Sequence, residues 1–190
     1  MSDSVLLWIA LAVLLFWSIG AYNRLMRLRF QASAAFGSLE HVLKQHVSIV
    51  QANFPAPAGN HSEFDPDQGH DTPDAAALRL VAAAGQFAVS LSIAKAAPLD
   101  ELTMSALRTA HEALHLSWSR VRDLPHDLAG PALSPALQSQ WEHTTSQAEL
   151  AEGEFARLVM VYNNAVQQFP ALLLAGLFGL KTAKSLATHD

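Results

Sequence analysis

The chain opens with an unbroken apolar stretch and then changes to a periodic pattern. Residues Val5 to Tyr22 read VLLWIALAVLLFWSIGAY and contain no charged side chain. As a helix this stretch is about 27 Å long, close to the ~30 Å hydrocarbon core of a bilayer. Ser18-Ile19-Gly20 resembles a signal-peptidase site, but the length of the stretch and the lack of Lys or Arg before it favour an uncleaved segment. We therefore predict a transmembrane anchor over residues 1–23.

The charges beside this stretch predict its orientation. Asp3 is the only ionised side chain before it, whereas Arg24, Arg27 and Arg29 follow it directly. Basic flanking residues tend to stay in the cytoplasm. We therefore predict a single-pass membrane protein with its N-terminus outside and residues 24–190 in the cytoplasm.

From Leu25 onward the apolar residues recur at helical spacing in four stretches, which predicts helices over 24–52, 73–97, 99–123 and 135–169. Pro55 and Pro57 end the first of them. Thr72-Pro73-Asp74 suits the start of the second, with a capping residue, a first-turn proline and an acid at the positive helix end. Four apolar stripes can bury one another at crossing angles of about 20°. The predicted fold is all-α, with the membrane helix continuing into an elongated antiparallel four-helix bundle over residues 24–170.

Each predicted helix has one apolar stripe that defines its buried face. The first stripe contains Leu25, Leu28, Ala32, Ala35, Leu39, Val42, His46 and Ile49, and the second contains Ala77, Leu80, Ala84, Phe87, Leu91 and Ala94. The third contains Leu107, Ala110, Leu114 and Val121, with Met104 and Trp118 close by. The fourth contains Leu137, Trp141, Thr144, Ala148, Ala151, Phe155, Leu158, Tyr162, Ala165 and Phe169. The alanines among these positions predict that the helices approach one another closely.

The composition narrows the classes of function. Apolar residues make up 51% of the chain and charged residues 15%, which is the balance of a folded protein and not of a disordered one. The formal net charge of −5 argues against nucleic acid as a partner, because that binding depends on Lys and Arg at the phosphates. Since the chain has no cysteine, it has no disulfide framework, thiolate nucleophile or Cys-ligated metal.

The C-terminal part of the last predicted helix and the residues after it carry a family motif. Residues 155–181 read FARLVMVYNNAVQQFPALLLAGLFGLK and contain Tyr162, Asn163, Phe169, Pro170, Gly176 and Gly179. Together with Tyr22-Asn23 at the exit of the apolar stretch, these residues resemble the LemA family. Val159, Phe36 and Glu40 depart from that family's usual pattern, so the chain resembles a divergent member. The resemblance implies a single-pass protein of a bacterial inner (plasma) membrane with a long helical bundle, and it brings no established catalytic residues.

His111-Glu112-Ala113-Leu114-His115 is a literal HExxH sequence in the third predicted helix. Histidines four residues apart share one helix face and can bind one zinc ion, with the glutamate polarising its water. A third ligand at the usual spacing is missing, however, and so is a strand-rich stretch. We therefore interpret the pair as an ordinary feature of a helix flank and predict no metal, cofactor or catalytic residue, with a zinc-dependent hydrolase as the alternative.

Two further segments leave alternatives open. The 53–73 connection holds His and acidic residues, among them Asp65 and Asp67, but it fails the EF-hand pattern and is interpreted as a solvated loop. Residues 171–180, ALLLAGLFGL, are too short to cross a bilayer. This apolar C-terminal segment, with the tail to residue 190, either covers the open end of the bundle or forms a docking or lipid-contacting surface.

These observations favour a scaffold over an enzyme. We predict a non-catalytic scaffold or adaptor that contacts the lipid bilayer through residues 5–22 and binds other membrane or membrane-associated proteins. Self-association into a homo-oligomer stays open. Besides the zinc hydrolase, the alternative is a lipid-contacting, membrane-remodelling module that uses Leu172–Leu180.

Overall fold

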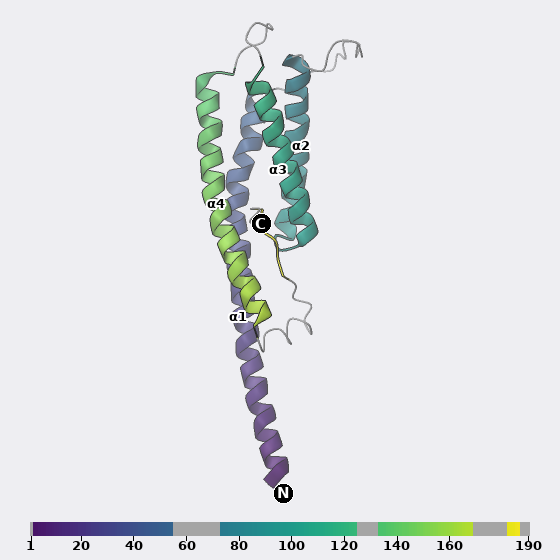
Figure 1. The fold of residues 1–190 in the computed structure, drawn as a ribbon, viewed down its shortest axis with the longest axis vertical. Coiled ribbons are helices and arrows are strands. Elements are labelled where there is room, and N and C mark those ends of the chain that lie inside the picture. Colours follow the sequence, from purple (N-terminus) through teal and green to yellow (C-terminus); the bar gives the residue numbers. More distant parts are fainter. Residues whose placement is uncertain (1, 55–72, 125–132, 169–181, 187–190) are drawn as a thin grey trace.

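A computed structural model describes residues 2–54, 73–124, 133–168 and 182–186. They form the helices α1 (Ser2–Asn53), α2 (Pro73–Ala96), α3 (Glu101–Arg122) and α4 (Pro135–Gln167), shown in Figure 1. No strand occurs within these ranges, so the predicted all-α class is confirmed. The 55–72 part of the first connection and the 171–180 segment lie outside the described residues.

Helix α1 is a single helix about 78 Å long, with an exposed N-terminal part and a second part that is buried in the core. Its N-terminal part extends beyond the other helices in Figure 1, and large apolar side chains such as Leu7, Trp8 and Phe16 are exposed there. From Leu25 to Val50 the same helix contributes fully buried side chains to the core. We call this second part of α1, together with α2, α3 and α4, the helical body.

In the helical body, α1 packs against α4 and also against α2, and α2 packs against α3. Contact with two neighbours requires a wide buried face, and Phe36, Leu43 and Val50 are buried beside the predicted row of Leu25, Ala32, Leu39 and His46. The single stripe predicted for this helix is therefore too narrow. The predicted positions Leu28, Ala35 and Val42 are only partly buried, because they lie at its margin.

Helices α3 and α4 are further apart than the other neighbouring pairs. No Cα atom of the described part of α3 lies within 8 Å of one in α4, so the space between them is bridged by large side chains. The indole rings of Trp118 and Trp141 stack there, with centroids 4.0 Å apart and planes at 7°. Between α1 and α4, by contrast, the rings of Phe36 and Phe155 meet edge to face at 5.4 Å.

Side-chain caps define where α3 and α4 begin. The Asp100 carboxylate accepts a hydrogen bond from the Thr103 amide at 3.0 Å, so α3 starts at Glu101 and not at the predicted residue 99. The Ser134 hydroxyl accepts from the Leu137 amide at 3.2 Å, and Pro135 occupies the first turn of α4. Both caps satisfy amide groups that the helices cannot pair internally.

Candidate functional site

Two described helices, α1 and α2, are long and apolar enough to cross a membrane, a criterion that core helices and signal sequences also meet. In α1 the apolar 18-residue window has no buried residue, whereas 28% of the corresponding window of α2 is buried. Leu80, Phe87 and Leu91 of α2 lie in the core, so packing accounts for much of its apolar character. No described helix covers the N-terminal part of α1.

Three histidines from two helices meet in the interior of the helical body. His111 and His115 lie one turn apart on α3, and their Nε2 atoms are 3.0 Å from each other. The ring of His46, from α1, is fully buried, with its centroid 5.5 Å from that of His115 and 6.2 Å from that of His111. We call these three residues the histidine cluster.

Aromatic rings enclose the histidine cluster. The indole of Trp141, on α4, meets His46 edge to face at 4.5 Å and lies 5.4 Å from His115. On the opposite side, the ring of Phe87 stacks on His111 at 5.3 Å. The cluster therefore joins residues of all four helices and fills part of the space between α3 and α4.

Burial keeps the histidine cluster uncharged. Burial, with a smaller effect of the neighbouring histidines, lowers the pKa of His46 to about 3 and that of His111 to about 4. Burial also lowers the pKa of His115, although the negative charge of Glu149 opposes this effect. One neutral imidazole donates and the other accepts in the His111–His115 hydrogen bond, and this bond is lost if both rings are protonated.

The polar partners of the cluster are incomplete. His46 Nε2 lies 3.1 Å from the Thr145 hydroxyl of α4, whereas its Nδ1 is buried without a hydrogen-bond partner. A cavity of about 330 Å³ opens beside the cluster between α3 and α4. Its lining includes His115, Trp118, Arg122, Trp141, Glu142 and Thr145.

The geometry of the HExxH sequence differs from that of a zinc hydrolase. His111 and His115 do share one face, but Glu112 is exposed on the surface of α3. In the described ranges, no three His, Asp or Glu side chains are gathered so that they could hold a metal ion. The observed partners of the two histidines are aromatic rings and another histidine, which is a core-packing environment. Sequence reasoning did not connect them with His46, since the pairing depends on how α1 and α3 pack.

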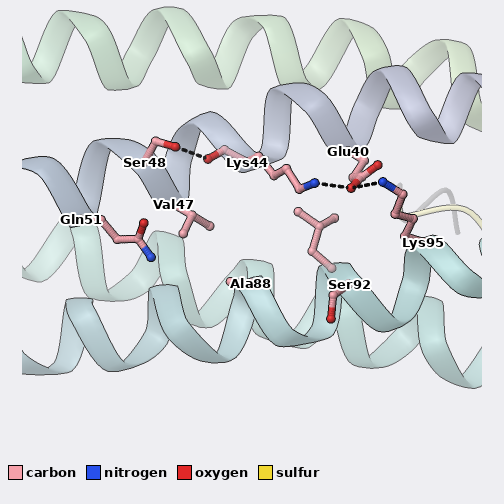
Figure 2. Close-up of a pocket in the computed structure, with 9 residues that line it drawn as sticks. Glu40, Lys44, Val47, Ser48, Gln51, Ala88, Ser92 and Lys95 are labelled. Atoms are coloured by element: carbon pink, nitrogen blue, oxygen red, sulfur yellow. Dashed lines mark hydrogen bonds and ion pairs between the residues drawn. The ribbon is translucent and has the colours of Figure 1, made fainter.

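A second polar site lies between α1 and α2, around Glu40. Its side chain is only 8% exposed, and Oε1 lies 2.6 Å from Lys44 Nζ and 3.2 Å from Lys95 Nζ. Figure 2 shows the Glu40 carboxylate between the two lysines. Burial raises the pKa of Glu40, but hydrogen bonding to the two lysines outweighs it and holds the pKa below its ordinary value. A cavity of about 310 Å³ runs along this site and continues past Val47 and Ser48. The three charges connect the last turn of α2 to α1.

We expect Glu40→Gln to lower the free energy of unfolding by about 1–2 kcal/mol. The change keeps the shape of the side chain but removes a largely buried charge that holds two ammonium groups. Urea unfolding of the full chain in one detergent, followed by circular dichroism, measures the effect. Glu154→Gln on α4 is the matched control, because its ion pair with Arg157 is exposed and the loss of this pair is expected to change stability far less. Equal losses in the two variants would contradict the role assigned to Glu40.

The motif residues of the sequence lie in different places. Tyr22 is partly buried and Asn23 is exposed, where α1 enters the helical body, and Tyr162 is buried on α4. The side-chain amide of Asn163 forms two hydrogen bonds with the backbone of Ala183, and so ties the chain's C-terminal part to α4. These bonds of Asn163 join α4 to a non-helical segment and not to another helix. Phe169, Pro170, Gly176 and Gly179 lie outside the described residues.

The chain matches no protein-family model, no curated protein and no solved structure. The resemblance to the LemA family therefore stays a prediction that depends on the motif residues. The functional interpretation depends on three features of the molecule: the uncovered N-terminal part of α1, the exposed apolar side chains of the helical body and the contacts of Asn163.

Proposed function

We propose that the chain is a single-pass membrane protein in which α1 anchors an elongated antiparallel four-helix bundle, and that it acts as a non-catalytic scaffold or adaptor for other proteins. In this proposal it is a divergent LemA-like protein of a bacterial inner membrane. Residues 5–22 lie in the bilayer, and the basic residues Arg24, Arg27 and Arg29 keep the bundle in the cytoplasm.

The division of α1 into an uncovered and a buried part carries this proposal. An 18-residue window of mean hydropathy 2.2 has none of its residues buried, which is costly in water and favourable in lipid. The same helix is buried against α2 and α4 from Leu25 onward. A bilayer around the first part completes the burial of the helix.

The surface of the helical body supports the scaffold role. Leu102 and Leu150 are each 77% exposed, and Val89 and Ile93 on the outer face of α2 are 61% and 52% exposed. Val89 and Ile93 lie one turn apart, so together they offer a protein partner an apolar surface on α2. Within the described ranges, no observation favours the zinc-hydrolase or membrane-remodelling alternative over this one.

We expect the full chain to sediment with membranes and to resist extraction by alkaline carbonate, because residues 5–22 are held in hydrocarbon. Removal of residues 2–22 is expected to release the chain into the soluble fraction with its helical circular dichroism retained. Leu14→Arg is the matched point variant. It is expected to weaken retention in the membrane, since an arginine near the centre of a span costs about 2.5–3.5 kcal/mol of insertion free energy. Release of the full chain by carbonate would contradict the anchor.

Orientation and partners need separate measurements. Because the chain has no cysteine, the single variants Ser4→Cys and Ser92→Cys can each be labelled with a membrane-impermeant maleimide on intact spheroplasts. Labelling at residue 4 alone is the expected result, and labelling at residue 92 alone would reverse the topology.

Crosslinking in intact cells, followed by mass spectrometry, tests the scaffold role, which requires a reproducible protein partner attached to the helical body.

A further inference from the structure

Residues 182–186 lie against the helical body, although they follow α4 by more than ten residues. The Asn163 Nδ2 group donates to the Ala183 carbonyl at 2.8 Å, and the Ala183 amide donates to Asn163 Oδ1, also at 2.8 Å. One side chain of α4 thus satisfies both backbone groups of a single residue in a non-helical segment. Such a pair of bonds recognises a peptide backbone and does not depend on its side chains.

The side chains of this segment add selectivity. Ala183 and Leu186 are 5% and 4% exposed and belong to the hydrophobic core. Between them, the Lys184 ammonium lies 2.5 Å from Glu101 Oε1 at the start of α3, and both groups are largely exposed. The site therefore accepts a small residue and a leucine three positions later, with a basic residue after the small one.

Backbone pairing combined with side-chain anchors is the chemistry by which proteins bind extended peptides. Here the segment is held through backbone bonds to one side chain, an exposed ion pair and two apolar side chains, and a second peptide of the same sequence can replace these contacts one for one. Attachment through the rest of the chain raises the effective concentration of the segment, so a weak site is still filled by it.

We propose that Asn163, Glu101 and the apolar surface under Ala183 and Leu186 form a peptide-binding site, which the chain's own residues 182–186 occupy as a displaceable ligand. Its partner is an extended peptide of another protein that repeats the order Ala-Lys-Ser-Leu of residues 183–186. Because this peptide-binding site is assigned a class of protein partner, the proposal rests on the proposed scaffold function. The test below uses purified protein and a synthetic peptide, so it can fail without bearing on whether the chain is a membrane scaffold in cells.

The first experiment frees the site and measures binding in trans. Ala183→Pro in the full chain removes the amide that donates to Asn163, and thereby weakens the internal segment. A fluorescent peptide of residues 181–190 is expected to bind this variant at least about tenfold more tightly than it binds wild type in the same detergent, because the site is no longer filled. Adding Asn163→Asp, which removes the donor to the Ala183 carbonyl, is expected to abolish binding. Asn164→Asp makes the same change at the exposed neighbouring residue and is expected to leave binding unaltered.

The second experiment uses the unaltered chain and does not depend on how the proline variant folds. A carbodiimide joins a lysine to a carboxylate in direct contact, so it is expected to crosslink Lys184 to Glu101. Excess 181–190 peptide is expected to reduce this crosslink at least about fivefold, whereas a peptide N-methylated at residue 183 is expected to leave it unchanged. Persistence of the crosslink at saturating peptide, or equal binding of the peptide to wild type and to Ala183→Pro, would overturn the proposal.

Discussion

Acidification from pH 7 to pH 5 is expected to lower the free energy of unfolding of the helical body by about 4 kcal/mol. Histidines in the unfolded chain take up protons near pH 6.5, whereas burial holds the pKa of His46 at about 3 and that of His111 at about 4 in the folded chain. The stabilising effect of the uncharged rings is complete above pH 6.5 and is lost progressively below it, down to these lower values. At pH 5 each residue contributes a loss of about 2 kcal/mol, since one pH unit corresponds to about 1.4 kcal/mol.

Urea unfolding at a series of pH values between 5 and 7.5 measures this dependence. His46→Leu is expected to remove about half of it, and to leave stability at pH 7 unchanged or higher, because the buried Nδ1 without a partner is removed as well. His143→Gln, at an exposed position of α4, is expected to keep the full dependence. A flat profile in wild type would show that the cluster is not buried as described.

Trp141→Ala is expected to cost about 3–5 kcal/mol, the largest loss among the single substitutions considered. The indole is 4% exposed and contacts Trp118, His46 and His115, in the region where the backbones of α3 and α4 are far apart. Its removal leaves a large cavity that the helices cannot close without moving, in addition to the lost burial of the ring. Thermal and urea unfolding at pH 7.5 give the change in stability.

Leu150→Ala is the matched control for this substitution. Leu150 lies on the same helix but is 77% exposed, so its truncation is expected to change stability by less than about 0.5 kcal/mol. A loss below about 1 kcal/mol for Trp141→Ala would show that α3 and α4 do not depend on this ring. The expected result is a wide difference between the two variants.

The apolar stripe of each single helix could be predicted more readily than the helices against which it packs. In α2 the predicted stripe is buried from Leu80 to Ala94, because this helix has an outer face that stays exposed. The predicted Ala77 is only partly buried, and Ala76 is buried in its place. In α4 the row shifts from the predicted Leu158 to Val159, since the side that faces α1 is decided by packing and both residues are apolar. In α1 a second buried row was missed, because a periodic pattern does not show that a helix has two neighbours.

The sites were predicted less completely than the helices, for a similar reason. The spacing of His111 and His115 places them on one face, but only the packing of α1 against α2 and α4 brings His46 to them. Glu40 and Lys44 are one turn apart, whereas Lys95 comes from a different helix. The bonds between Asn163 and Ala183 join a helix to a short non-helical segment, for which local pattern carries no signal.

The unbroken course of α1 has a mechanical consequence. Between Tyr22, where the apolar stretch ends, and Asn53, where the helix ends, lie about 46 Å of helix with no proline to act as a hinge. With its first part embedded, a 5° change in tilt, of the kind that follows a change in bilayer thickness, would swing the distal end sideways by about 4 Å. A protein docked at that end would therefore sense the state of the lipid through a lever arm, without touching the membrane itself.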